Sequence, residues 1–302
     1  MYKKNQEHRL IVSNNTGAAL IITLLLMTLI TGLVVEFVYE VYIGTSSLAN
    51  WRDAQKASLI AKSGQSITSN YIKGIKELSF TYYDELILPV ELDFGPDTKL
   101  TVKVEDENAK FNINSIIYEN GQDNDKEALP SFKRLLEYLK INPELADLIA
   151  DWIDPDTIPR IGDSETNAKN SSLWDINEIK YIKGIDDEIF KKVSPYITVY
   201  GNRLNTPINI NTAQLPVLIS LDKAITEDFA EKIINYRESS PFESKEDIIG
   251  LSESNPLVAI KHRLTVKSSY FRVTARAEVN GTTRVIESVI DTSMNIHLWR
   301  EG

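Results

Sequence analysis

The chain has 302 residues, of which 42% are hydrophobic and 25% charged, and its formal net charge is −10 at pH 7. This length and apolar content allow more than one compact unit with its own core, and they exclude a disordered tail. The absence of cysteine excludes disulfides and thiolate metal sites. The acidity disfavours nucleic acid or anionic lipid as the main partner and favours divalent cations.

An uncharged apolar run from Ala18 to Val35 follows a short basic start that contains Lys3, Lys4 and Arg9. As a helix, this run would be about 27 Å long, which is close to the thickness of the hydrocarbon core of a membrane. Basic residues before a membrane span stay in the cytoplasm. We therefore predict one transmembrane segment over residues 18–43, a cytoplasmic N-terminus, and the rest of the chain on the other side of the membrane.

The helical pattern continues beyond the apolar run. Apolar residues recur at helical spacing at Val34, Phe37, Val38 and Val41, and the first proline is Pro89. The sequence thus predicts one long helix that leaves the membrane and carries an apolar stripe able to pack against partner helices. This helix is expected to be least rigid near Gly32, Gly44 and Gly64.

The pattern then changes from helix to strand. Two alternating segments, Leu86–Phe94 and Lys99–Asp106, flank the turn sequence GPD. A second pair of strands, residues 270–279 and 282–291, is joined by Asn280-Gly281, which is typical of a type I′ hairpin turn.

This two-residue turn fixes the predicted register of the hairpin. Ala275 should lie opposite Ile286, and Phe271 opposite Ile290, so that both strands bury the same face. Because strands occur both early and late in the chain, we predict an α+β fold. A long N-terminal helix packs on a small antiparallel sheet built from residues 44–112 and 266–302, and a large insertion interrupts that sheet.

The insertion, residues 113–265, is predicted to be an all-helical domain. Seven short segments pair apolar positions three or four residues apart, and Asp175 and Thr226 are expected to cap two of them. Helix pairs around Gly184 and over 218–237 look like degenerate helix-hairpin-helix or SAM-like units. The asparagines of the FNIN and NIN strings are expected to bond backbone groups and to have a structural role (Asn114, Asn209 and Asn211).

The start of the chain resembles the type IV pilin and pseudopilin class. The resemblance implies a pilin-like architecture, cleavage of residues 1–17 after Gly17 by a prepilin peptidase, and Ala18 as the new N-terminus. Most members carry glutamate at the fifth mature position, whereas this chain has Ile22 there. A carboxylate in the apolar layer is costly unless it is paired. A subunit without it is expected at the end of a filament.

Three further strings resemble the protein K family of type II secretion. They are FNIN with DLIADWIDPDTIPRIGDSE, then SLWDINEIKYIKGIDDEIFKKVSPYITVY, and then PININTAQLPVLISL with PFESKEDIIGL. The resemblance implies a minor pseudopilin that caps the tip of the periplasmic pseudopilus, helps to initiate its assembly, and serves export of folded proteins across the outer membrane. It also implies a single-pass protein of the bacterial inner membrane whose bulk is periplasmic. The implied partners are other minor pseudopilins, the major pseudopilin and the prepilin peptidase.

The local feature that most clearly suggests a binding site is an acidic loop near the start of the insertion. Prolines and Gly162 keep the loop out of regular helix, so several carboxylate oxygens could converge on one hard cation. A solvated acidic loop is the alternative reading. The resemblance to protein K implies calcium in this helical domain. We predict Asp154, Asp156 and Glu165 as ligands, with Asp151 and Asp163 in reserve. The segment NAKNSS replaces the family's aromatic loop, which leaves ligands from that loop in doubt.

Two other functions are weighed against an assembly role. A glycosidase needs paired carboxylates and aromatic platforms, for which Trp152 beside Asp151 and Asp154 is the main support. Scattered histidines and the lack of a nucleophile motif favour a protein without enzymatic activity. A minor pilin of a type IV pilus or a DNA-uptake pseudopilus is the alternative assembly role. The acidic insertion disfavours contact with nucleic acid.

Overall fold

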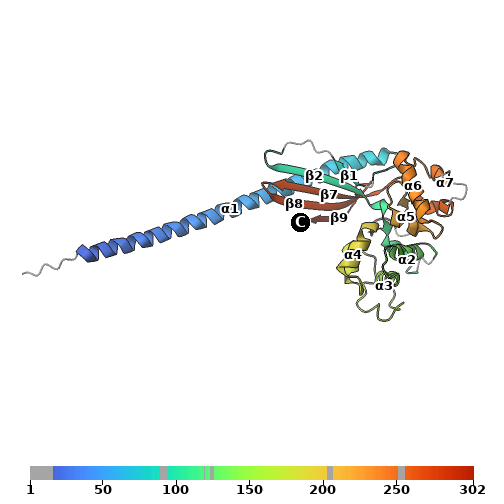
Figure 1. The fold of residues 1–302 in the computed structure, drawn as a ribbon, viewed down its shortest axis with the longest axis horizontal. Coiled ribbons are helices and arrows are strands. Elements are labelled where there is room, and N and C mark those ends of the chain that lie inside the picture. Colours follow the sequence, from blue (N-terminus) through green and yellow to red (C-terminus); the bar gives the residue numbers. More distant parts are fainter. Residues whose placement is uncertain are drawn as a thin grey trace, which may run out of the picture. The chain divides into compact units, whose positions relative to one another are not determined.

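The computed structural model describes residues 16–83, 85–88, 94–118, 120–122, 126–202, 207–250 and 256–302. The chain divides into two compact units, residues 1–55 and 56–302. In the described part of the first unit the chain forms a single helix, α1 (Thr16–Glu77), which continues into the second unit (Figure 1). The basic residues of the predicted leader, Lys3, Lys4 and Arg9, lie outside the described residues.

The second unit contains a five-stranded antiparallel sheet. Its strands lie in the order β1-β2-β7-β8-β9. Their bounds are β1 (Glu85–Leu88), β2 (Thr98–Asp106), β7 (Tyr270–Val279), β8 (Thr282–Asp291) and β9 (Ile296–Glu301). The predicted first strand is shorter than expected among the described residues, and residues 89–93 lie outside them.

The C-terminal hairpin confirms the predicted register. Ala275 pairs with Ile286 and Phe271 with Ile290. Asn280 and Gly281 have φ angles of 49° and 81°, which is the left-handed conformation that a type I′ turn requires at both positions. β2 pairs with β7 over nine residues, from Thr98 opposite Val279 to Asp106 opposite Phe271. Strands from both sides of the insertion are therefore direct neighbours.

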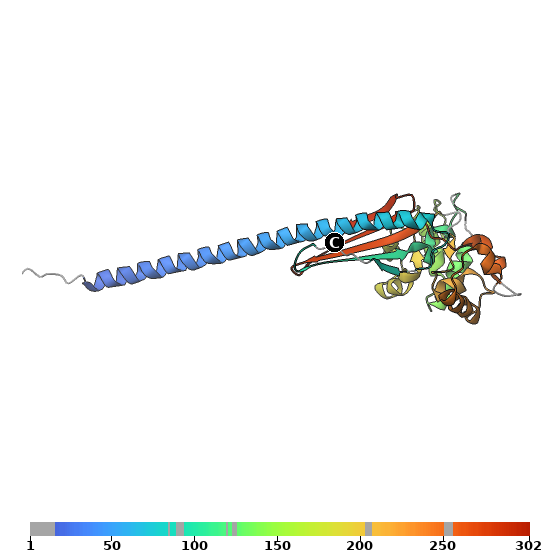
Figure 2. The ribbon, with the colours of Figure 1, turned by 90° about the horizontal axis from the view of Figure 1, so that it is seen from above.

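The last turns of α1 cover one face of this sheet (Figure 2). Ala57, Ala61 and Ile72 of the helix form one buried cluster with strand residues such as Val273 and Ile286. Helix and sheet approach so closely because of Gly64. A Cβ atom there would lie 2.9 Å from Val102 Cγ2 and 3.1 Å from Ala275 Cβ. Gly64 thus serves close packing in the folded protein, a reason that the helical pattern did not reveal.

Replacing Gly64 by alanine should destabilise the second unit. We expect the Gly64→Ala variant to lose about 1 to 3 kcal/mol of unfolding free energy, because an added methyl group overpacks the core. Gly74 is the matched control, since it lies in the same helix with nothing within 4 Å of an added Cβ. Gly74→Ala should leave stability unchanged or raise it by up to about 1 kcal/mol. Denaturant unfolding in detergent, followed by tryptophan fluorescence, measures both variants, and equal effects would contradict the packing argument.

The insertion between β2 and β7 contains two hydrophobic cores. The first draws on residues 111–200 and on Val289 of β8, with Phe111 stacked on Phe132 at 5.5 Å between ring centroids. The second draws on residues 208–266. The helices of the first are α2 (Ala128–Tyr138), α3 (Leu145–Ile153) and α4 (Asp187–Val193), and those of the second are α5 (Leu215–Leu221), α6 (Glu227–Ser239) and α7 (Lys245–Ile249).

Each core begins and ends with a short strand, and the two strands pair in parallel. The prediction of an all-helical insertion did not include these strands. β3 (Phe111–Asn112) pairs with β4 (Ile197–Thr198), and β5 (Ile208–Asn209) pairs with β6 (Leu264–Thr265). The rest of the insertion is built from α-helices, short 3₁₀ turns and loops among the described residues.

Asparagines stabilise both strand pairs, as predicted. Asn114 Nδ2 donates to the carbonyls of Leu173 and Val199. Asn211 Nδ2 donates to the Phe242 carbonyl at 2.9 Å and Asn211 Oδ1 accepts from the Phe242 N–H at 2.9 Å. These buried amides satisfy backbone groups that would otherwise be buried without a partner, and they tie loop residues to the two strand pairs.

One of the seven helical segments predicted in the insertion, WDINEIKYI over 174–182, forms a 3₁₀ helix instead of an α-helix, η3 (Ile176–Tyr181). Asp175 caps it as predicted, and Glu178 completes a capping box. Ile176, Ile179 and Ile182 all pack into the first core. Because these isoleucines are three residues apart, three residues per turn place all of them on one face, whereas the α-helical period would spread them.

Asp106 joins the sheet to the second core. Its carboxylate is buried and accepts hydrogen bonds from the Asn108 N–H, Asn209 Nδ2, Thr212 Oγ1 and Ser268 Oγ. Burial raises the pKa of Asp106 to about 6, although these four donors favour the ionised form.

The stability of the protein should reflect this raised pKa. The pKa of Asp106 in the folded protein exceeds its ordinary value of 3.8, so the folded state binds the proton more tightly than the unfolded state does. The stability that this group contributes is therefore fully present below about pH 4, and it is lost as the pH rises through about 6. The difference in unfolding free energy between the wild type and Asp106→Asn should therefore shrink from pH 4 to pH 7. Asp97→Asn is the control, because Asp97 is exposed and asparagine tolerates its φ of 53°. A difference that is constant or grows with pH would refute the assignment.

Candidate functional site

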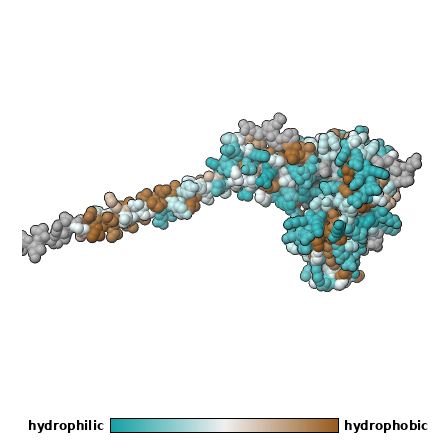
Figure 3. Space-filling view, in the orientation of Figure 1, coloured by the Kyte–Doolittle hydropathy of each residue, from teal (hydrophilic) through white to brown (hydrophobic). Residues whose placement is uncertain are grey.

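The first site is the N-terminal part of α1. From Gly17 onward this helix is long and apolar enough to cross a membrane, and its most apolar window is not buried. Figure 3 shows the apolar side chains along it. Gly17 and Ala18, the predicted processing residues, lie at its start. The side chains predicted to take part in assembly are each at least 46% exposed (Ile22, Val34, Phe37, Val38 and Val41).

The second site is the acidic loop that follows α3. Asp151 lies in the last turn of that helix, and Asp154 is its C-cap residue, with an extended ψ of 159°. Pro155 follows and prevents the helix from continuing. Farther along, Gly162 and Asn170 have φ angles of 54° and 51°, left-handed values that glycine and asparagine adopt at low cost. These residues turn the loop back toward the end of α3.

Three carboxylates converge where the loop meets the helix. Asp151 and Asp154 are completely buried, and Glu165 is partly buried. One oxygen of each lies within 4.8 Å of the others. Buried carboxylates of the same sign repel each other unless a cation compensates them.

Arg160 supplies part of this compensation. Its Nη1 donates to Asp151 Oδ1 and to Asp154 Oδ2. The other oxygen of Asp151 accepts from the Arg160 backbone N–H at 2.9 Å and from Ser164 Oγ. Both oxygens of Asp151 are therefore already bonded within the protein.

The remaining oxygens of the cluster have no hydrogen-bond partner. Among the described residues six buried side-chain atoms lack one, and five of these belong to the segment 152–170. They are Trp152 Nε1, Asp154 Oδ1, both carboxylate oxygens of Glu165, and Asn170 Oδ1. The Asn170 side chain is fixed because its Nδ2 donates to the Asp156 carbonyl at 2.8 Å. Unpaired buried oxygens of this kind are expected where a cation binds.

Two of the predicted ligands lie outside this cluster. Asp156 is exposed, and its Oδ1 accepts from the Ile158 N–H at 2.7 Å, which closes a local turn. Asp163 is exposed and lies 3.2 Å from Lys183 Nζ. The hydrogen bond to that ammonium lowers the pKa of Asp163. The structure thus brings together Asp154, Glu165 and the reserve residue Asp151, but not Asp156 or Asp163.

The electrostatics of the cluster fit a divalent cation. Three carboxylates and one guanidinium leave two net negative charges in a mostly buried volume. Burial raises the pKa of Asp154, and burial together with the neighbouring Asp154 carboxylate raises the pKa of Glu165. An ion with two positive charges would compensate the remaining charge, and oxygen ligands suit a hard ion such as Ca²⁺.

Sequence reasoning missed two residues of this site. Asn170 is the last asparagine of the NAKNSS segment. Nothing in that segment indicates that this residue folds back to the C-terminal end of α3. Arg160 lies in the acidic string, and nothing local to that string indicates that its guanidinium joins two aspartates.

Comparison with known proteins places the insertion in one family. Two family models, each described as type II secretion system protein K, match residues 109–202 and 208–267. The chain belongs to the type II secretion system protein K family. The two matched ranges coincide with the two cores of the insertion, residues 111–200 and 208–266.

Two curated relatives carry the same family name. Type II secretion system protein K of Pseudomonas aeruginosa is 28% identical over 224 residues, which cover 67% of this chain and 63% of that protein. The protein K of Aeromonas hydrophila is 26% identical over 234 residues, covering 68% of this chain and 69% of the relative. The chain thus spans slightly less than two thirds of the length of the Pseudomonas protein.

A solved structure shares the fold of this chain. A chain of the crystal structure of the GspK-GspI-GspJ complex from enterotoxigenic Escherichia coli superposes with a TM-score of 0.62 at 18% identity. The match covers 85% of this chain and 99% of that chain. The long N-terminal helix, the antiparallel sheet and the helical segments therefore form a mixed α+β fold, as predicted.

Proposed function

We propose that this chain is a minor pseudopilin that caps the tip of the periplasmic pseudopilus of a type II secretion system. It helps to initiate pseudopilus assembly and so serves export of folded proteins across the outer membrane. Membership of the protein K family is the observation that carries this proposal. The chain acts as an assembly subunit rather than an enzyme.

The anchor and its processing support this role. Residues 18–43 of α1 would span the inner membrane, with the N-terminus in the cytoplasm and the bulk of the chain in the periplasm. A prepilin peptidase would cut after Gly17 and leave Ala18 as the N-terminal residue. The exposed residues Val34, Phe37, Val38 and Val41 would then pack against helices of other subunits.

The place at the tip is supported by two features. Ile22, at the fifth mature position, offers no carboxylate to a neighbouring subunit within the apolar layer. The insertion between β2 and β7 adds two helical cores to the sheet, and this bulk would exclude a further subunit above it. Other minor pseudopilins are the proposed partners, since the similar Escherichia coli chain comes from a complex with GspI and GspJ. The major pseudopilin would follow below them.

Introducing a carboxylate at position 22 should impair assembly. An unpaired acid inside the membrane costs about 2.5 to 3.5 kcal/mol, so Ile22→Glu should lower recovery of the companion minor pseudopilins with this chain by tenfold or more. Ile22→Leu is the matched control and should behave like the wild type. Affinity purification from membranes measures recovery, and imaging of the labelled chain locates it.

The proposal predicts label at filament ends. Label spaced regularly along the filament shaft would contradict tip capping. If Ile22→Glu recovers as much of the companion minor pseudopilins as the wild type, the absence of a carboxylate at position 22 has no role in assembly.

We further propose that the acidic loop binds calcium. Asp154, Glu165 and Asn170 would be ligands, because their buried oxygens are unpaired. Asp151 would position the site through Arg160 and Ser164. The bound ion would compensate the residual negative charge and hold the loop against α3.

Removing one ligand charge should weaken calcium binding. We expect Glu165→Gln to lower the affinity for Ca²⁺ at least tenfold and to lower the thermal midpoint measured in calcium. Asp163→Asn is the matched control, because Asp163 is an exposed carboxylate two residues away that pairs with Lys183. Calorimetric titration of the chelated full-length protein with CaCl₂ measures the affinity. Equal loss in both variants, or no calcium binding by the wild type, would refute the site.

A further inference from the structure

A cavity lies beside the acidic loop. It has a volume of about 510 Å³, which is in the range of small-molecule pockets. α3 supplies Leu148 and Trp152 to its lining, and η3 ends at Tyr181, which lines the cavity together with the two residues that follow it. Residues 163–167 of the loop supply the rest, with Glu165 not among the lining side chains.

Two of the side chains that line this cavity, Trp152 and Tyr181, are aromatic. Tyr181 is 77% exposed, and Trp152 is partly buried among first-core residues. An exposed tyrosine ring at the mouth of a cavity gives a rigid flat surface at little conformational cost. Such a surface can contact the C–H face of a sugar ring.

The polar side chains of the lining carry no net charge. Asp163 and Lys183 pair with each other at 3.2 Å, so neither offers an uncompensated charge to a ligand. Thr166 and Asn167 are exposed at the same edge and provide both donors and acceptors of hydrogen bonds. This combination suits a ligand with many hydroxyl or amide groups and no charge of its own.

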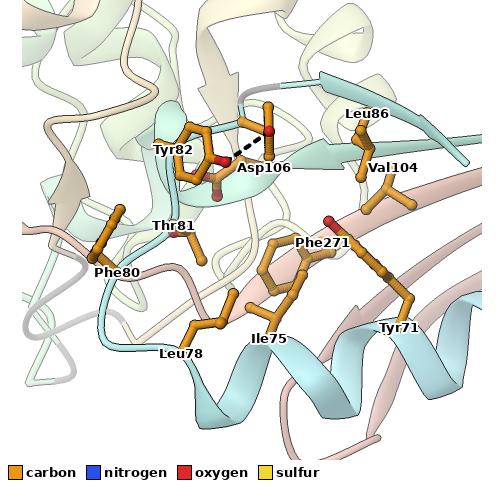
Figure 4. A pocket seen from close by; sticks show the side chains of 11 residues that line it. Tyr71, Ile75, Leu78, Phe80, Thr81, Tyr82, Leu86, Val104, Asp106 and Phe271 are labelled. Atoms are coloured by element: carbon orange, nitrogen blue, oxygen red, sulfur yellow. Dashed lines mark hydrogen bonds between the residues drawn. The ribbon is translucent and has the colours of Figure 1, made fainter. Parts of the chain in front are cut away.

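The contrast with another cavity supports this choice of ligand. A cavity of about 210 Å³ lies between the end of α1 and the sheet, where Tyr71, Ile75, Phe271 and other mostly apolar side chains line it (Figure 4). Asp106 also lines it, but this carboxylate is bonded to four donors of the protein. That cavity suits an apolar group, whereas the cavity beside the acidic loop combines two aromatic side chains with polar side chains that carry no net charge.

We propose that the cavity formed by α3, the acidic loop and the end of η3 binds an uncharged sugar ring. The C–H face of the ring lies on Tyr181 and Trp152, and its hydroxyl or acetamido groups bond to Thr166, Asn167 and the Asp163–Lys183 pair. No covalent step is involved. This inference does not depend on the proposed role in secretion, because the cavity is formed by described residues of one core.

The test is a binding titration of the full-length protein. Calcium is present at a saturating concentration, so that the acidic loop has the same conformation in every titration. The detergent has no sugar headgroup, so that the micelle itself does not compete for the cavity. Chitotriose and maltotriose are the probes, which separate acetamido-bearing from hydroxyl-only rings. We expect saturable binding of at least one trisaccharide, weakened about tenfold by Tyr181→Ala.

Two further variants make the result specific. Trp174 is also 77% exposed and directly precedes the N-cap residue of η3, but it does not line the cavity, so Trp174→Ala should bind within about twofold of the wild type. Thr166→Val keeps the side-chain shape while removing the hydroxyl, and should weaken binding severalfold. The proposal is overturned if neither trisaccharide binds, if Tyr181→Ala binds like the wild type, or if Trp174→Ala loses as much affinity.

Discussion

The pairing of β2 with β7 is the constraint on which the second unit depends. The two strands pair over nine residues, although 164 residues separate Asp106 from its partner Phe271. Closing so long a loop costs about 4 to 5 kcal/mol of chain entropy. The nine-residue ladder and the packing of α1 on it must offset this cost. Because Gly64 lets α1 approach both β2 and β7, one helix reinforces the junction between strands from the two sides of the insertion.

Buried carboxylates at two places are compensated in different ways. Asp106 is surrounded by four hydrogen-bond donors and needs no ion. In the acidic loop, three carboxylates share one guanidinium, and oxygens of Asp154 and Glu165 have no donor. The number of donors relative to buried charge therefore distinguishes a structural carboxylate from a candidate ligand. This distinction is not visible in the sequence, where both are acidic residues followed by polar segments.

Local patterns predicted much of the fold. The register of β7 and β8 followed from alternation and a two-residue turn, and Asp175 and Thr226 cap helices as expected. The sequence failed where the outcome depends on distant partners. Nothing near Gly64 indicates that Val102 and Ala275 lie against it. In the acidic loop, the predicted residue Glu165 lies in the cluster, whereas the predicted residues Asp156 and Asp163 do not. Left-handed residues turn the loop so that Asn170, which was not predicted, also faces inward. A loop held by such turns cannot be read from residue spacing.

The two parallel strand pairs have a consequence for how the insertion tolerates change. β3 lies beside β4 and β5 beside β6, so each core begins and ends at the same place. Residues gained or lost inside one core therefore need not displace its points of attachment. Each half of the insertion is thus free to lengthen or shorten its loops on its own, while the sheet that carries both keeps its geometry.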